Sequence, residues 1–358
     1  MYVLVVIFVV LSIAVYVISR AYSPSASKQI KQYYLNILFL LLALIMGLRG
    51  VTVGADTDNY RQIFNDIAST SLNIANVGFF YDGIEIGFVM YTKILSIIWR
   101  EYQFFLLISA VIFCFLMKRF IQHSTADYYI ASVVFFSIGI YLSAFNIYRQ
   151  MLAVAILANA WINFTEKQYA KAILLTLLST TLHVSAIIFI VVYIAYLFRN
   201  NKIVMRAVPL LMILVYITFS DLIVSIAPFM EHYGNYMSNH KVIQEVNTVV
   251  VLWLIEGAVS LFFIYKSSMS PMRQFLGNMT LMYVLMNLIG LKFNYVERLG
   301  LYFAPFLILL FCNLSDSIKN RNVKDVLFLG LITCFLIYFL MSTSTEQYTY
   351  VSPLFSVL

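Results

Sequence analysis

Apolar runs of about 15 to 20 residues recur along the chain, and short basic segments separate them. An α-helix of that length can cross the hydrocarbon core of a bilayer. No segment shows the strict alternation of apolar and polar residues that a half-buried strand requires. The pattern therefore predicts an all-α, polytopic helical membrane protein with about twelve transmembrane helices, at residues 1–19, 34–50, 103–118, 128–147, 151–165, 169–182, 184–198, 206–222, 248–265, 275–291, 299–315 and 325–341.

One apolar piece, Ile86 to Trp99, is too short for this role and is interrupted by Lys93. As a helix it reaches roughly 21 Å, against the ~30 Å of a hydrocarbon core. We therefore expect an interfacial amphipathic helix on the external face. The stretch 169–198 is expected to be a tight hairpin, although one long span over the same residues stays open.

The distribution of charge sets the orientation. With these spans, 15 of the 23 basic residues lie in cytoplasmic loops beside only four carboxylates, as the positive-inside bias requires. The N- and C-termini of this multi-pass protein are then extracytoplasmic; its place in the bacterial cytoplasmic (inner) membrane is implied only by the family resemblance given below. We expect one integral membrane domain over residues 1–358, with an external loop at 51–101 that holds the interfacial helix and a second external loop at 227–247.

Composition agrees with a membrane protein. The chain is 62% hydrophobic and 11% charged, with a mean hydropathy of +0.89, whereas a soluble protein carries about a quarter charged residues. The formal charge of +7 does not indicate nucleic acid, because the basic residues gather in the cytoplasmic loops. The three cysteines, Cys114, Cys312 and Cys334, lie inside apolar runs without CxxC spacing and are expected in the core.

The first candidate chemistry is the stretch LRGVTVGADTDNY, where an apolar run gives way abruptly to polar residues. A charge at the end of a membrane helix usually has a partner or a function, and glycine permits turns and close approach of a ligand. The alternative is an interfacial anchor, with a snorkelling arginine and an aspartate that caps the next helix. The candidate residues of this stretch are Arg49, Gly50, Gly54, Asp56, Asp58 and Tyr60.

Two more arginines are expected at the same depth on the external face. Arg149 precedes Gln150 between two spans, and Arg298 follows Tyr295 in the sequence NYVERLG. Each arginine alone is more often an anchor that snorkels from a helix end, but three at one level favour an anionic ligand, because the guanidinium fork suits bidentate phosphate binding.

Acid–base candidates accompany them. Transfer to a hydroxyl needs a group that takes its proton, most often His, Asp or Glu, and the candidates are His183, Asp56, Asp58, Glu85 and Glu297. His183 can also be a buried, hydrogen-bonded histidine, and Glu297 can pair locally with Arg298. Glu256 lies inside a span, and the loop 227–247 mixes aromatic and polar residues. We expect no metal site and no cofactor.

In order and spacing these motifs resemble the EpsG family of membrane polysaccharide-synthesis proteins, related to Wzy-type polymerases. The resemblance covers roughly residues 30–310 and is carried by Arg49–Gly50 with Gly54, Asp56 and Tyr60, by Glu85 with Gly87 and Phe88, by Tyr102–Gln103, by Arg149–Gln150 with Leu152–Ala153, and by His183 with Ser185.

The resemblance implies a polymerase that joins oligosaccharide repeat units carried on undecaprenyl diphosphate at the outer face of the membrane. Arg49, Arg149 and Arg298 would neutralise the leaving diphosphate. One of His183, Asp56 or Glu85 would be the catalytic base, and the remaining candidates (Gly50, Gly54, Asp58, Tyr60, Gln150 and Tyr295) would contact substrate. The expected partners are that lipid-linked oligosaccharide and membrane lipids, with room for a chain-length regulator and a flippase of the same pathway. Two other classes stay open, a flippase or transporter of lipid-linked sugars and a membrane acyltransferase, as does an O-antigen ligase.

Overall fold

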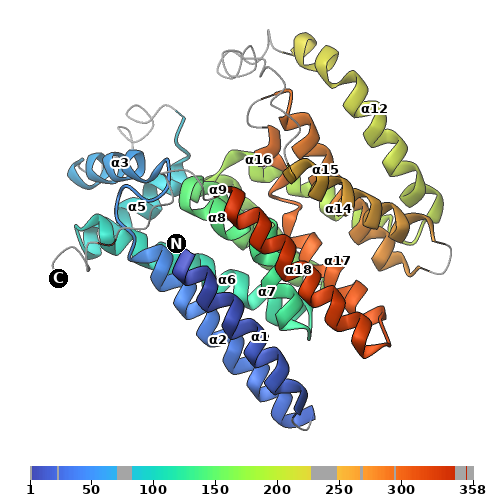
Figure 1. Cartoon of the computed structure of the whole chain (residues 1–358). Coiled ribbons are helices and arrows are strands. Elements are labelled where there is room, and N and C mark those ends of the chain that lie inside the picture. The colour runs from blue at the N-terminus through green and yellow to red at the C-terminus, as the bar shows by residue number, and fades with distance from the viewer. Residues whose placement is uncertain are drawn as a thin grey trace. The chain divides into compact units, whose positions relative to one another are not determined.

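The computed structural model describes residues 2–21, 24–70, 83–226, 248–266, 269–293, 296–342 and 352. Within these ranges the secondary structure is helical, without a β-strand, which confirms the all-α prediction (Figure 1). The chain divides into two compact units, the first formed by Met1–Ile187 and Asn320–Leu358 and the second by Ile188–Lys319. That they form the single membrane domain expected above stays a prediction.

The first unit is built around α9 (Tyr148–Thr165), which is buried on all sides. It packs against α6 (Tyr102–Ser124) and α10 (Tyr169–Leu182), and α6 packs in turn against α2 (Pro24–Gly47). Such an apolar helix is stable only where neighbours cover every face. The buried Asn159 of α9 is hydrogen-bonded, because its amide nitrogen donates to Leu116 O and its amide oxygen accepts from Arg119 Nη1.

Two further helices close this unit. α1 (Tyr2–Ala21) lies beside α2, and α18 (Arg321–Ser342) packs on α7 (Tyr128–Ser137) (Figure 1). The Tyr16 hydroxyl donates to Asp325 at 2.7 Å and its ring stacks on Phe328, which ties the last described helix to the first.

The span predicted at 128–147 is not one straight helix. It consists of α7 and α8 (Ile140–Asn146), which meet at an angle of 44°. Gly139 between them has φ +73°, a left-handed conformation that glycine adopts without steric cost. The last turn of α8 thereby reaches the loop that follows α2, as its contacts below show.

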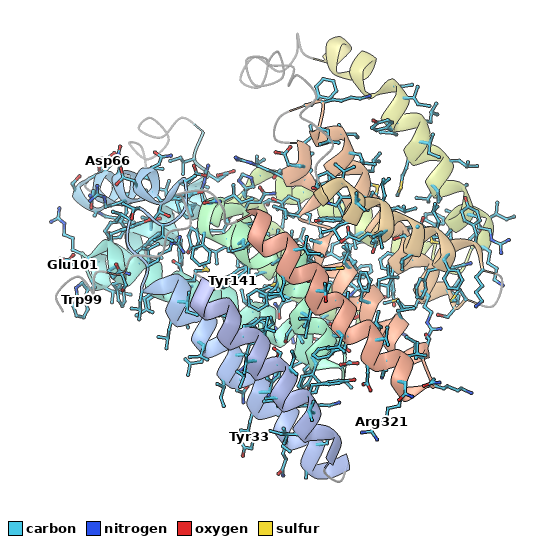
Figure 2. All side chains as sticks on the ribbon, viewed as in Figure 1. Tyr33, Asp66, Trp99, Glu101, Tyr141 and Arg321 are labelled. Carbon is cyan, nitrogen blue, oxygen red and sulfur yellow. The ribbon has the colours of Figure 1, made fainter. Side chains whose placement is uncertain are left out.

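The described part of the stretch 51–101 holds two short helices, α3 (Thr57–Ser69) and α5 (Ile86–Ile98). The Lys93 ammonium donates to the carbonyl groups of Ile67, Ala68 and Thr70 at 2.6 to 3.2 Å, so the residue that interrupts the apolar run caps the end of α3. On its open side α5 exposes Ile86, Met90, Ile94, Ile97 and Ile98. Trp99 and Glu101 project outward from the turn after it (Figure 2).

The second unit contains α11 (Ile190–Leu197), α12 (Lys202–Ile226), α14 (Thr248–Tyr265), α15 (Pro271–Gly290), α16 (Val296–Gly300) and α17 (Ala304–Ser317). α14 and α15 pair closely, because Gly277 lets the backbone of Ser260 approach and Gln274 donates to Ile264 O. The prediction of one continuous helix at 299–315 is wrong at its start. The segment is divided into α16 and α17, and Pro305 lies in the first turn of α17, where its missing N–H is tolerated.

Within the described residues, α2 (over Ala26–Gly47) and α6 are long and apolar enough to cross a membrane, and the bent pair α7–α8 is a third candidate. Several other apolar helices have 10 to 17 residues. The apolar helices make the chain a membrane-embedded protein, while the count of about twelve spans and the orientation of the termini stay predictions.

Candidate functional site

Arg49 lies at the end of α2 and is 2% exposed. Its Nη1 donates to Met46 O at 3.0 Å, and its Nη2 donates to Phe145 O at 3.2 Å in α8. The guanidinium also lies 4.7 Å from the centre of the Phe145 ring. The last carbonyl groups of a helix lack partners within that helix. Arg49 donates to such carbonyl groups at the ends of both α2 and α8, and it thereby joins the two helices.

The end of α2 and the loop that follows it are held on several sides. The Gln103 amide donates to Gly47 O at 2.5 Å, and the Ser352 hydroxyl donates to Leu48 O at 2.7 Å. Farther along the loop, Ala55 N–H donates to the Asn146 side chain at 2.8 Å. The loop is therefore a fixed platform from which α3 starts.

The structure explains why one of the two glycines in this loop, Gly54, must be glycine. It has φ +96°, and a Cβ built on it would lie 2.5 Å from Phe145 O. Both the backbone conformation and the close approach require glycine. Gly50 is buried, and its carbonyl accepts from Val53 N–H at 3.1 Å in a tight turn.

The structure brings together three of the predicted functional residues. Arg149, in the first turn of α9, places Nη1 2.5 Å from Glu85 Oε2. The other carboxylate oxygen, Oε1, lies 2.9 Å from His183 Nδ1 and accepts from Val184 N–H at 2.9 Å. The three side chains are 19%, 16% and 25% exposed, in the order Arg149, Glu85, His183. They form a partly buried Arg–Glu–His cluster.

The helices that carry this cluster meet at a close contact. Glu85 directly precedes α5, and His183 directly follows α10. Gly87 lies so near Thr181 that a Cβ would be 2.6 Å from the threonine Cβ and carbonyl oxygen. Glycine at this position therefore sets the separation of α5 and α10, and with it the distance from Glu85 to His183.

The electrostatics favour an ionised Glu85. Burial raises the pKa of its carboxyl group, but the His183 ring, the Val184 N–H and the Arg149 charge outweigh burial, so the pKa is lowered overall. Burial raises the pKa of the Tyr60 hydroxyl, and the adjacent Arg149 offsets part of that rise. Tyr60 thus lies beside the guanidinium as a neutral hydrogen-bonding group.

An aromatic layer supports the cluster. The Arg149 guanidinium lies 5.7 Å from the centre of the Phe88 ring. Phe88 contacts the rings of Tyr60 and Tyr148 with centroids 5.9 and 6.2 Å away, and the Tyr91 hydroxyl is hydrogen-bonded to Ser109 at 2.7 Å. Rings packed edge to face hold each other in place, so Arg149 rests on a rigid surface.

The remaining candidates of the first unit lie around this cluster. Asp56 precedes α3, is half-buried and makes no side-chain cap, although its charge acts on Tyr60. Asp58 is about half exposed and pairs with Arg61 at 2.6 Å within α3. Gln150 is buried at 2% exposure beside Arg149.

The other candidate residues lie in the second unit or outside the described residues. Arg298 lies half-buried in α16, and Tyr295 lies outside the described residues, as does the loop 227–247. Glu297 Oε2 and Glu256 Oε2 are buried without a hydrogen-bond partner among the described residues. That Arg298 meets Arg49 and Arg149 stays a prediction.

Two contributions to the cluster are not visible in sequence patterns. Gly83 O accepts from Arg149 Nη1 at 3.3 Å, and Val184 N–H donates to Glu85. Both are backbone groups, so no residue type signals them. No group of three or more His, Cys, Asp or Glu side chains within the described ranges can hold a metal ion.

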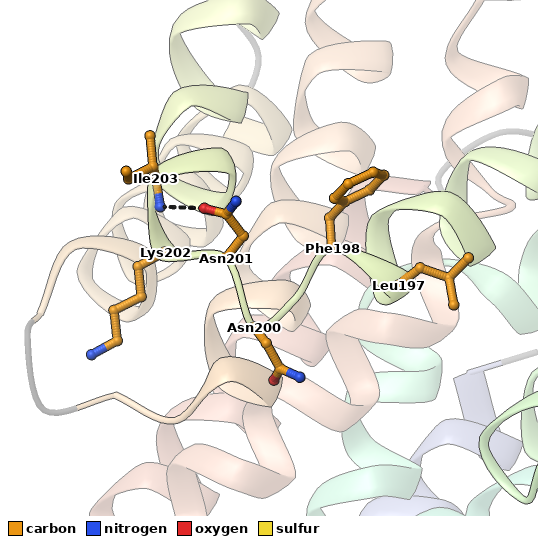
Figure 3. Close-up of a pocket in the computed structure, with 6 residues that line it drawn as sticks. All are labelled: Leu197, Phe198, Asn200, Asn201, Lys202 and Ile203. Carbon is orange, nitrogen blue, oxygen red and sulfur yellow. Dashed lines mark hydrogen bonds between the residues drawn. The ribbon is translucent and has the colours of Figure 1, made fainter.

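A surface pocket lies elsewhere, at the turn between α11 and α12 (Figure 3). It is lined by residues 197–203 without 199, including Asn200 and Lys202. The Asn201 side chain accepts from Ile203 N–H at 3.1 Å and from Val204 N–H at 3.2 Å, which is helix capping at the start of α12. The pocket shares no residue with the Arg–Glu–His cluster, and the Asn201 side chain in it caps α12.

The fold and the contacts define a helical, membrane-embedded protein with a partly buried Arg–Glu–His cluster. The chain belongs to the EpsG family, whose model matches residues 32–356. This is a Wzy-type polymerase-like family associated with polysaccharide biosynthesis, and the match confirms the resemblance inferred from the motifs. The searches of curated proteins and of solved structures return no match.

Proposed function

We propose that this protein is a polymerase that joins undecaprenyl-diphosphate-linked oligosaccharide repeat units by glycosyl transfer at the outer face of the cytoplasmic membrane. The observation that carries the proposal is the Arg149–Glu85–His183 cluster, which combines a cation for the leaving group with a base for the acceptor. Family membership supports the wider class of reaction.

Arg149 binds the diphosphate in this proposal. When the bond between the anomeric carbon and the phosphate oxygen breaks, the electron pair leaves with the diphosphate, and a fixed guanidinium stabilises that charge. Arg149 is suited to this because it is 19% exposed and rests on the Phe88 ring. Arg49 is suited to a positioning role, because it is buried against two carbonyl groups.

His183 is the base in this proposal. A carboxylate beside Nδ1 favours the tautomer that carries its proton there, which leaves Nε2 to accept the proton of the acceptor hydroxyl. Glu85 Oε1 lies 2.9 Å from Nδ1, so the carboxylate charge acts on that side of the ring, although the contact lacks hydrogen-bond geometry. As that proton leaves, the hydroxyl oxygen forms the new bond to the anomeric carbon.

The apolar surface beside the cluster suits the lipid. The exposed face of α5 begins at Ile86, directly after Glu85, and continues through Met90 and Ile94. On α10, Leu174 and Leu178 are exposed as well. A polyprenyl chain on this surface would keep its diphosphate at the cluster.

The proposal is tested in a deletion strain complemented with variants, with polymer length followed on a gel. Arg149→Ala and His183→Ala are expected to lose the ladder of long chains. The matched controls are Arg61→Ala, which removes an exposed arginine of α3, and His123→Ala, which removes an exposed histidine of α6; both should keep it. A full ladder with Arg149→Ala would remove Arg149 from the mechanism.

A flippase of lipid-linked sugars is the second candidate, because the bent pair α7–α8 is a feature that transporters share. The two functions leave different material behind. A strain without the polymerase accumulates single repeat units outside the membrane, whereas a strain without the flippase lacks external repeat units. Incorporation of labelled acetyl groups would instead indicate an acyltransferase.

A further inference from the structure

The Glu85 carboxylate occupies a complete anion-binding position. It receives Arg149 Nη1 on one oxygen and Val184 N–H on the other, with His183 Nδ1 2.9 Å from the second oxygen. A guanidinium, a backbone N–H and an imidazole are the groups that proteins use to bind phosphate. The position is therefore built for an anion, and a residue of the chain itself fills it.

A phosphate group would satisfy more of these donors than the carboxylate does. Arg149 Nε is buried and makes no hydrogen bond with a described residue, although a guanidinium offers five N–H groups. Each phosphate group of the lipid-linked substrate presents two non-bridging oxygens besides its bridging ones, and the terminal phosphate of the diphosphate product presents three, whereas a carboxylate has two oxygens in all. The cluster thus has donor capacity that Glu85 leaves unused.

Glu85 is free to move without unwinding a helix. It precedes α5 with an extended backbone (φ −69°, ψ 140°), and its side chain makes no cap on that helix. The helix is held at this end by backbone bonds, since Glu85 O accepts from Phe88 N–H and Val89 N–H. A rotation of the side chain would expose Arg149 and leave these bonds intact.

We propose that Glu85 is an exchangeable internal anion. In the substrate-free protein it holds the position that one phosphate group of the lipid diphosphate takes on binding, so that the phosphate then replaces the carboxylate as the anion beside His183 Nδ1, and Glu85 returns there as the diphosphate product leaves. This inference rests on the proposed function, because it assigns Arg149 the same ligand. It adds Val184 N–H as a phosphate donor and makes Glu85 a competitor that speeds product release.

The test is binding of inorganic pyrophosphate to the purified full-length protein in nanodiscs, followed by calorimetry. Glu85→Gln keeps the shape of the side chain and removes its charge, so pyrophosphate should bind about tenfold tighter than to the wild type, the order expected when a partly exposed ion pair no longer competes. Glu101→Gln removes the same charge from an exposed position and should leave binding unchanged. Glu85→Asp keeps the charge with a shorter reach, should fall between the two, and replaces Glu85→Gln if that variant does not fold.

The outcomes separate this inference from the proposed function. If Arg149→Ala abolishes pyrophosphate binding while Glu85→Gln binds no tighter than the wild type, Glu85 is not a competitor, and the role of Arg149 stands. If all variants bind alike, the cluster is not the phosphate site and both ideas are wrong. As a second readout, sodium acetate should weaken pyrophosphate binding to Glu85→Gln more than to the wild type, because in the variant acetate does not have to displace a carboxylate.

Discussion

Replacement of Gly54 by alanine tests whether the loop after α2 is held rigidly against α8. The added Cβ would lie 2.5 Å from Phe145 O, 2.9 Å from Thr57 Oγ1 and 3.1 Å from Asn146 Oδ1. Two costs combine. A non-glycine residue at positive φ costs about 1–2 kcal/mol, and an overpacked contact that cannot relax costs about 1–3 kcal/mol. We therefore expect Gly54→Ala to lower the free energy of unfolding by about 2–5 kcal/mol.

Two other glycines separate these costs. Gly83 has φ +86° with nothing within 4 Å of its added Cβ, so Gly83→Ala should show only the backbone cost of about 1–2 kcal/mol. Gly330 lies inside α18 with open space around it, so Gly330→Ala should stabilise the helix by up to about 1 kcal/mol. The measurement is denaturant unfolding in mixed micelles, followed by tryptophan fluorescence.

The order of the three variants decides the argument. If Gly54→Ala were no more destabilised than Gly83→Ala, Phe145 O would yield to the new methyl group, and the loop would not be a fixed platform. Arg49 donates to the same carbonyl oxygen. Crowding at that oxygen in Gly54→Ala would therefore also disturb the contact of Arg49 at the end of α2, and we expect shorter polymer in Gly54→Ala cells.

Three more predictions follow from single contacts. Lys93→Met removes the cap of α3 and should cost about 1–3 kcal/mol in the same unfolding assay, because charged hydrogen bonds contribute that much, whereas the exposed Lys171→Met should be neutral. Gly87→Ala drives α5 away from Thr181 and should shorten the polymer on a gel; an unchanged ladder would show that this spacing is not needed. Because the pKa of Glu85 is lowered, its ion pair stabilises the fold fully above the ordinary pKa of a glutamate and stabilises it less as the pH falls below that value. The excess stability of the wild type over Glu85→Gln should therefore be constant near neutral pH and should decline on acidification. A constant difference throughout would contradict it.

Local sequence signals located the helices well but not their interruptions. The apolar runs at 103–118 and 169–182 correspond to α6 and α10, because an apolar segment in a membrane has few alternatives to a helix. Local signals mark both interruptions, a glycine at the break itself (Gly139) and Pro305 in the first turn of α17. In an otherwise apolar run, hydrophobic periodicity outweighed these single residues.

The sequence by itself determined the class of the protein and the residue types of its chemistry. Long apolar runs with basic separators require membrane helices, because unpaired backbone groups are too costly in lipid. The order of the motifs from Arg49 to His183 identified the family. These properties depend on composition and on neighbours along the chain, so they are readable without a structure.

Only the tertiary structure decided which of these residues meet. Arg149 and Glu85 are 64 positions apart, and Glu85 and Val184 are 99 apart, so their contact depends on how α5, α9 and α10 pack. The same packing gives Arg49 and Arg149 different surroundings, two carbonyl groups for the first and a carboxylate for the second. Chemically identical side chains thus differ in burial and in neighbours, and neither difference is encoded locally.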